Sequence, residues 1–256
     1  MEPHMKPQIG LIPGIIRDET RADFWGAMEQ VAEIGYEGIE GGMNLIEGSV
    51  SRNKARLDGL GLQAVSLGAS RQQLADDLDR LIDGALALEA RHISTWWGPC
   101  ESADQMRRDA AFYEAVGERV AVAGMKFCYH NHDHELLTTF DGVSGLDLLM
   151  AETNPAHVSI ELDIAWVVYG GDDPVDFIAR HPGRFPVIHV KDIADLGERA
   201  KFTSVGTGVV DVKGSIEAGM SSGVEWFVVE QDAPNNLTPM ESVTVSYLNL
   251  KEMGFA

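Results

Sequence analysis

The chain has 256 residues, of which 45% are hydrophobic and 23% are charged, a composition typical of a soluble globular protein. Its formal net charge of −20 argues against nucleic acid as a partner, because binding to phosphates requires lysine and arginine. No apolar run approaches the roughly 20 residues of a membrane-spanning helix, and residues 1–7 lack the apolar core of a secretion signal. Two cysteines, Cys100 and Cys128, are too few for a disulfide framework, which suits a reducing compartment. Together these features predict a cytoplasmic protein with no membrane partner.

Short apolar segments alternate with longer amphipathic segments along the whole chain. The short segments have the length and composition of buried strands, and the longer ones follow the helical period of about 3.6 residues. In chain order, the expected strand and helix pairs are 9–12 and 21–34, 37–40 and 51–60, 62–67 and 72–88, 92–96 and 103–123, 126–130 and 143–152, 158–163 and 174–180, 186–190 and 209–218, and 224–229 and 242–251.

Eight strand–helix pairs in succession predict a parallel sheet with helices on its outside. The chain length matches the roughly 250 residues of a (β/α)8 TIM barrel, in which eight parallel strands close on themselves. An open, doubly wound sheet is the competing arrangement, but no Gly-x-Gly-x-x-Gly motif follows the first strand. We therefore predict a single α/β domain over residues 1–256 that folds as a TIM barrel.

Polar, ionisable or aromatic side chains stand at the ends of most of these strands. They include Glu40; Trp96 and Trp97; His130, Asn131, His132, Asp133, His134 and Glu135; Glu161, Asp163 and Trp166; His189, Lys191 and Asp192; and Glu230, Gln231 and Asp232. The active sites of TIM barrels lie at the carboxyl ends of the strands. Because ionisable groups are costly to bury unless they are paired or bind a cation, this recurrence favours one shared site.

Each residue also has a purely structural explanation. Asp163 can cap the next helix, His189 can be a core histidine bonded to a carbonyl group, and the tryptophans can serve only packing. Glu230, which ends an apolar strand, is harder to explain in that way. Carboxylates with an imidazole suit Mn²⁺, Mg²⁺ or Zn²⁺. Such a cation can stabilise the enediolate of a sugar, and a nearby histidine, glutamate or lysine can move the proton.

Several segments resemble the sugar phosphate isomerase/epimerase superfamily, whose members share a xylose isomerase-like TIM barrel. The segments are 32–40 (AEIGYEGIE), 129–135 (YHNHDHE), 161–166 (ELDIAW), 189–192 (HVKD) and 205–208 (VGTG). The resemblance covers nearly the whole chain, and the combination is more specific than any one segment. The His-Asn-His run and Trp166 are most similar to the branch with inosose dehydratase-like and 3-keto-glycoside lyase proteins.

The resemblance implies a divalent cation held by four side chains from the fifth to the eighth strands. Three of these ligands are Asp163, His189 and Glu230. Ketose 3-epimerases of the superfamily carry a glutamate within the fifth strand, where this chain has Tyr129 or His130. We predict that Glu135, in the loop just beyond that strand, replaces it, and His132 is the second choice.

The other candidates are expected to transfer protons or to line the pocket. His130 or His132 would act as general base or acid, and Lys191 would orient substrate oxygens or stabilise negative charge. The residues expected to line the pocket are Glu40, Trp96, Glu161 and Trp166. Glu161 shares a strand face with Asp163, which predicts a position one layer deeper in the barrel.

These features predict a metal-dependent enzyme that acts on a keto-sugar, sugar acid or cyclitol ketone through an enolate. Isomerisation or epimerisation is the leading hypothesis, and dehydration or lysis of a keto-sugar or glycoside is the alternative. The resemblance implies that a 3-epimerase uses two glutamates on opposite sides of its substrate, and the glutamate of the fifth strand is missing in this chain. A non-catalytic sugar-binding barrel is a hypothesis of another class. The expected partner is a small sugar or sugar-derived ketone, and association into a homo-oligomer stays open.

Overall fold

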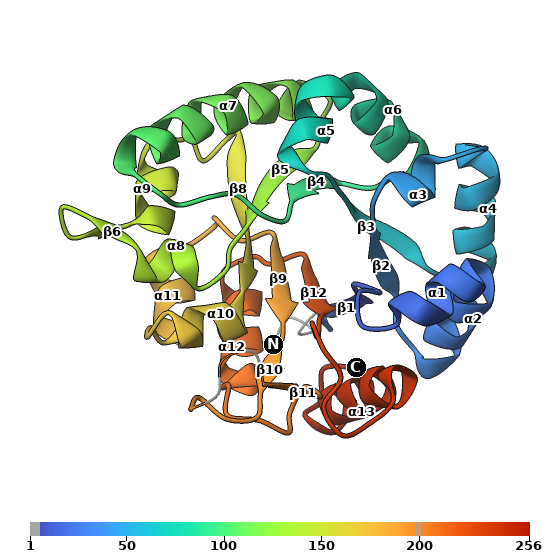
Figure 1. Cartoon of the computed structure of the whole chain (residues 1–256). Coiled ribbons are helices and arrows are strands. Elements are labelled where there is room, and N and C mark those ends of the chain that lie inside the picture. The colour runs from blue at the N-terminus through green and yellow to red at the C-terminus, as the bar shows by residue number, and fades with distance from the viewer. Residues whose placement is uncertain (1–5, 198, 200) are drawn as a thin grey trace, which may run out of the picture.

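The main sheet of the computed structural model, which describes residues 6–197, 199 and 201–256, is a closed barrel of eight parallel strands. Around the barrel the strands follow the order β1 (Gln8–Leu11), β12 (Trp226–Val229), β9 (Val187–Val190), β8 (Val158–Asp163), β5 (Lys126–His130), β4 (His92–Thr95), β3 (Gln63–Gly68) and β2 (Gly38–Gly41). Helices surround the barrel on its outside (Figure 1). The predicted fold class, a (β/α)8 TIM barrel, is confirmed.

The connections after the strands carry the helices and two short antiparallel ribbons. The helices are α1 (Arg17–Ala22), α2 (Phe24–Ile34), α3 (Met43–Ile46), α4 (Val50–Leu60), α5 (Arg71–Asp76), α6 (Leu78–Leu88), α7 (Ala103–Val122), α8 (His134–Leu137), α9 (Gly145–Ala151), α10 (Ile164–Tyr169), α11 (Pro174–Arg180), α12 (Val212–Ser221) and α13 (Pro239–Glu252). The ribbons pair β6 (Thr139–Phe140) with β7 (Val143–Ser144) and β10 (Asp192–Ile193) with β11 (Phe202–Thr203). No helix in the described part of the chain is long and apolar enough to span a membrane.

Two of the predicted helices are each divided into two. The expected helix 21–34 breaks at Asp23, whose side chain accepts a hydrogen bond from the Gly26 N–H and starts α2. The expected helix 72–88 breaks at Asp77, between α5 and α6. The buried Leu74 and Leu78 continue one apolar stripe across the second break, so periodicity alone predicts one helix there. At the first break, α1 has no buried residue.

Two other helices begin later than predicted because side-chain caps fix their first turns. The segment 143–152 starts as part of a ribbon, and the segment 209–218 starts as a loop. Ser144 and Asp211 each accept a hydrogen bond from the backbone N–H three residues further on, at 3.0 and 2.9 Å. These caps satisfy N–H groups that a helix start otherwise leaves without a partner.

An apolar cluster fills the barrel interior below the level of His189. The cluster consists of Val65, Val187, Trp226 and Val228. Strand register pairs His189 with Val228 and Val187 with Trp226, so these side chains share the inner face of the sheet. A Cβ atom on Gly38 would lie 2.7 Å from the Trp226 ring, which explains why β2 has a glycine at this position. The interior therefore has a packed apolar floor.

At the amino end of the barrel, Glu225 joins the starts of two other strands. Its carboxylate lies 2.6 Å from Lys126 Nζ and 3.4 Å from His92 Nε2. These two partners lower the pKa of Glu225 to about 2, although partial burial opposes the shift. A carboxylate whose folded-state pKa is lowered stabilises the fold above its ordinary pKa, and that contribution is lost as the pH falls towards 2.

We predict that Glu225→Gln lowers the free energy of unfolding by about 1–2 kcal/mol at pH 7, the linkage value being discounted for solvent screening. The loss should be smaller at pH 3, because the unfolded wild-type chain is largely protonated there at this position. Urea unfolding of the wild type and the variant at pH 7 and pH 3 measures this loss of stability. An equal loss at both values would contradict a charge-based contribution.

Candidate active site

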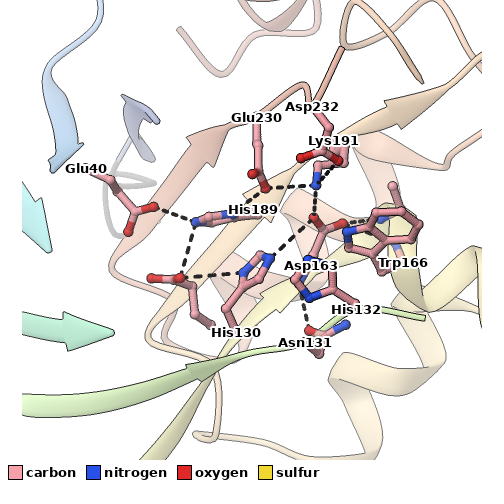
Figure 2. Close-up of polar contacts among 12 residues, drawn as sticks. Glu40, His130, Asn131, His132, Asp163, Trp166, His189, Lys191, Glu230 and Asp232 are labelled. Carbon is pink, nitrogen blue, oxygen red and sulfur yellow. Dashed lines mark hydrogen bonds and ion pairs between the residues drawn. The ribbon is translucent and has the colours of Figure 1, made fainter. Parts of the chain in front are cut away.

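Four side chains that are far apart in the sequence meet at the carboxyl end of the barrel. His130 ends β5, Asp163 ends β8, His189 lies in β9 and Glu230 directly follows β12. One nitrogen or oxygen atom from each lies within 4.8 Å of the atoms from the other three. Figure 2 shows these side chains pointing towards one another. We call this set the four-residue group. It contains three of the four predicted cation ligands, Asp163, His189 and Glu230, together with His130.

Asp163 serves both the fold and the site. Its Oδ1 accepts hydrogen bonds from the backbone N–H groups of Ala165 and Trp166, at 2.9 and 3.1 Å, and so caps α10. Its own N–H donates to Asn131 Oδ1 at 3.0 Å. These contacts fix the carboxylate and leave Oδ2 facing Lys191 Nζ, 2.7 Å away. Asp163 is therefore a helix cap, as its structural explanation predicted. The same cap directs the second carboxylate oxygen into the four-residue group.

His189 is held through both ring nitrogens. Its Nδ1 lies 2.7 Å from Glu230 Oε2 within the group, and its Nε2 lies 2.7 Å from Glu40 Oε2 beneath it. Ser66 donates a short hydrogen bond to the other oxygen of Glu40, at 2.5 Å. Burial alone would lower the pKa of His189, but the surrounding carboxylates raise it well above its ordinary value. An imidazole with one nitrogen on a carboxylate and the other facing a ligand group is typical of metal-binding histidines.

Glu161 and Glu40 form a buried carboxyl pair below the two imidazoles. Glu161 Oε2 lies 3.5 Å from both His130 Nδ1 and His189 Nε2. Burial and the neighbouring Glu40 raise the pKa of Glu161 well above its ordinary value, whereas His189 overcomes burial and lowers the pKa of Glu40. Both residues are 2% exposed, so the structure places them as supports of the imidazoles and not on an open pocket wall.

Lys191 is fully buried among three carboxylates. Its Nζ lies 2.7 Å from Asp163, 2.9 Å from Glu230 and 2.8 Å from Asp232. These carboxylates outweigh the effect of burial and raise the pKa of the lysine, which keeps it protonated. The ring of Trp166 lies 5.1 Å from Nζ and shields the ammonium on one side. The ammonium is thus a fixed positive charge at the edge of the four-residue group.

The donor set of the four-residue group fits a divalent cation. It offers two imidazoles and two carboxylates, which are ligand types of Zn²⁺ and Mn²⁺. Burial and the charge of His189 lower the pKa of His130 well below its ordinary value, so the ring is in the neutral form that binds cations. Burial raises the pKa of Asp163 to about 6 even though Lys191 is in contact with it, and a bound cation would favour its ionised form.

Glu135 lies in a different group from the one we expected. It is completely buried, and it accepts hydrogen bonds from the Tyr129 hydroxyl at 2.7 Å and from the His132 backbone N–H at 2.8 Å. Its neighbours with cation-binding atoms are His132 and His134. At the position where we predicted Glu135, the structure brings His130 to Asp163, His189 and Glu230 instead, because His130 is the last residue of the strand itself.

The aromatic candidates differ in position. Trp166 is 5% exposed, and its ring lies 5.5 Å from the ring of His132, which in turn lies 5.0 Å from that of His130. Trp96 is 45% exposed at the end of β4 and covers Gly68, at the end of β3. Trp166 therefore forms a wall next to the imidazoles, and Trp96 lies nearer the solvent.

Three residues that shape the site received no role from the sequence patterns. Asn131 holds the backbone of Asp163, Ser66 holds Glu40, and Asp232 faces Lys191. Asn131 and Asp232 stand in the strand-end runs that the sequence singled out, so their positions were detectable. No sequence pattern pointed to Ser66, because a serine within a strand is common and its partner Glu40 lies on another strand.

Residues 28–246 match the model of the xylose isomerase-like TIM barrel family. The chain belongs to this family. An inosose dehydratase from Lacticaseibacillus casei is 31% identical over 155 residues, which cover 54% of this chain and 51% of that protein. The chain thus spans about half the length of the curated relatives it matches first.

Solved structures of the same barrel type superpose over nearly the full chain. A sugar phosphate isomerase/epimerase from Parabacteroides distasonis has a TM-score of 0.83 at 21% identity and covers 100% of this chain and 97% of that one. The IolI protein with a bound zinc atom has a TM-score of 0.74 at 12% identity and covers 98% and 99%. At these identities the likeness shows the fold.

We predict that Lys191→Met lowers the free energy of unfolding of the metal-free protein by about 3 kcal/mol, because it leaves buried carboxylates without their counter-charge. Added Zn²⁺ or Mn²⁺ should then raise the stability of the variant more than that of the wild type. Urea unfolding with chelator and with each metal measures both effects. Lys213→Met, at an exposed lysine 3.9 Å from Glu217, is the matched control and should change little. An unchanged stability of Lys191→Met would contradict the role given to the ammonium.

Proposed function

We propose that this chain is a metal-dependent dehydratase, a carbon–oxygen lyase, that acts on a cyclitol ketone or a related keto-sugar. The convergence of the four-residue group at the active end of the barrel is the observation on which this proposal rests. The similarity to inosose dehydratases supports the choice of dehydration and of an inosose, the ketone of an inositol, as the first substrate to test.

We propose His130, Asp163, His189 and Glu230 as the ligands of the divalent cation. His130 takes the place that we first gave to Glu135, because it is the residue that the fold brings to the other three. The zinc atom bound in the IolI structure supports a divalent metal for this barrel type. When bound, the cation supplies Lewis acidity that polarises the ketone oxygen of the substrate.

The protein groups around the cation provide the remaining functions. Dehydration breaks a C–H bond next to the ketone and the C–O bond of the hydroxyl on the following carbon, which leaves with a proton as water. We assign the proton transfer to His132, whose ring lies 5.0 Å from that of His130 and 5.5 Å from that of Trp166. Burial and the Lys191 charge lower the pKa of His132 to about 4, so the ring is neutral at pH 7. The Lys191 ammonium would stabilise the negative charge that develops on the enolate oxygen.

The architecture also favours dehydration over 3-epimerisation. The epimerases that the sequence resembles use two glutamates on opposite sides of the substrate. In this chain the fifth strand ends in a histidine, and Glu161 is a buried carboxyl group that contacts His130 and His189. One-sided proton transfer followed by loss of a hydroxyl group requires no second glutamate.

We expect inosose incubated with the metal-loaded protein in D2O to lose one molecule of water, which NMR and mass spectrometry detect directly. An isomerase or epimerase would introduce deuterium without loss of water. A non-catalytic sugar-binding barrel would do neither, and calorimetry would detect its saturable binding. Deuterium incorporation without dehydration over a panel of keto-sugars and cyclitol ketones would therefore overturn the proposed reaction.

We predict that Asp163→Asn lowers the metal affinity of the four-residue group and the dehydratase turnover by at least about 100-fold, because it removes a charged ligand from the cation. The amide oxygen can still cap α10, so the fold should persist. Asp173→Asn is the matched control, since Asp173 caps α11 in the same way on the outside of the barrel. Metal analysis and turnover are measured on both variants. Full metal content in Asp163→Asn would contradict the ligand assignment.

A further inference from the structure

A second group of cation-binding side chains lies in the loop after β5. It consists of His132, His134 and Glu135, and one ligand-type atom of each lies within 4.8 Å of the others. We call it the loop group. Glu135 is completely buried, and His134 is the only ionic partner found for it among the described residues. The hydrogen bonds that it accepts from the Tyr129 hydroxyl and the His132 N–H compensate the buried carboxylate only in part, so a further positive charge would stabilise it.

The hydrogen bond of His134 fixes which of its nitrogens is free. His134 Nε2 lies 2.9 Å from the carbonyl oxygen of Gly98, which can only accept, so Nε2 carries the proton. In the neutral ring, Nδ1 then presents a lone pair to Glu135 Oε2 at 3.3 Å. Two acceptors that face each other at this distance repel unless a proton or a cation lies between them.

The third member of the loop group also has a free nitrogen. His132 Nδ1 is buried and has no hydrogen-bond partner among the described residues. The backbone N–H of the same residue donates to Glu135 Oε2, which keeps the imidazole close to the carboxylate. Buried imidazole nitrogens of a native protein normally have a partner, so this orphaned atom is a second and independent indication of a ligand.

From these contacts we propose that His132, His134 and Glu135 bind a second divalent cation, for which Zn²⁺ fits best. Two imidazoles and one carboxylate form a common zinc ligand set that leaves a fourth position open. With metal–ligand bonds of about 2.0–2.2 Å, two ligands of a tetrahedral ion lie about 3.4 Å apart. The 3.3 Å between His134 Nδ1 and Glu135 Oε2 matches this separation.

The loop group adjoins the proposed reaction centre through His132. A cation on Nδ1 would fix the side chain and leave Nε2 as its protonated nitrogen, so that His132 would donate a hydrogen bond to the leaving hydroxyl. This consequence rests on the proposed function, whereas the cation site itself rests only on the geometry of the loop group.

The test is the Zn²⁺ stoichiometry of the full chain, stripped with chelator, titrated with Zn²⁺ alone and measured by elemental analysis after gel filtration. We expect two equivalents for the wild type and one for His134→Gln, whose amide can still donate to Gly98. Glu135→Gln, a second variant of the loop group, should also bind one. Asp163→Asn should bind one, and its double variant with His134→Gln should bind none. His157→Gln, at a histidine paired with Glu114 outside both groups, is the control and should keep two.

The outcomes separate the two sites. One equivalent in the wild type, with no further loss in folded His134→Gln or Glu135→Gln, would show that a proton and not a cation occupies the loop group, and would overturn this proposal. Unchanged binding in Asp163→Asn would instead count against the four-residue group and the proposed function. Substitution with Co²⁺ gives an independent signal, because loss of an imidazole ligand changes its absorption spectrum.

Discussion

The burial of several carboxylates around one ammonium and two imidazoles is the constraint to which the rest of this structure responds. Lys191 has no exposed surface and contacts three carboxylates. His189 contacts one of these three, Glu230, and also Glu40 below it. In such a network the removal of one member leaves its partners charged and without compensation. The residues that would perform chemistry therefore also hold strands together. The bond between Glu40 and His189, for example, links β2 to β9 across 149 positions of the chain.

The fold confines this polar layer to one end of the barrel. Below it, Trp226 and its valine neighbours fill the interior, and the glycine at position 38 makes room for the indole ring. Water therefore cannot reach the supporting carboxylates from beneath, and the low polarity of the floor strengthens every interaction above it. The amino end has a separate ionic contact at Glu225. A substitution there can change the free energy of unfolding without altering the residues of the four-residue group.

The barrel and most of the four-residue group could be predicted from sequence because parallel strands place their carboxyl ends together. That rule locates Asp163, His189 and Glu230 without any knowledge of loops. It does not locate Glu135, since a residue five positions beyond a strand can turn in many directions, and here it turns towards Tyr129. The helix break at Asp77 was missed for another reason, because the buried Leu74 and Leu78 continue one apolar stripe across it. At Asp23 a local cap, the hydrogen bond that its side chain accepts from Gly26, starts a new helix.

The histidine at the end of β5 changes the charge of the proposed ligand set. Two carboxylates and two imidazoles together neutralise a divalent cation, whereas three carboxylates and one imidazole would leave the complex with a net negative charge. A cation in the neutral set retains more of its ability to polarise a ketone oxygen. A histidine at this position also provides no carboxylate that could act as a base, so in the proposed reaction the proton transfer comes from a neighbouring group such as His132. In the proposed function, His130 thus links the ligand set to the reaction, since a histidine at this position favours polarisation and elimination over proton exchange between two opposed carboxylates.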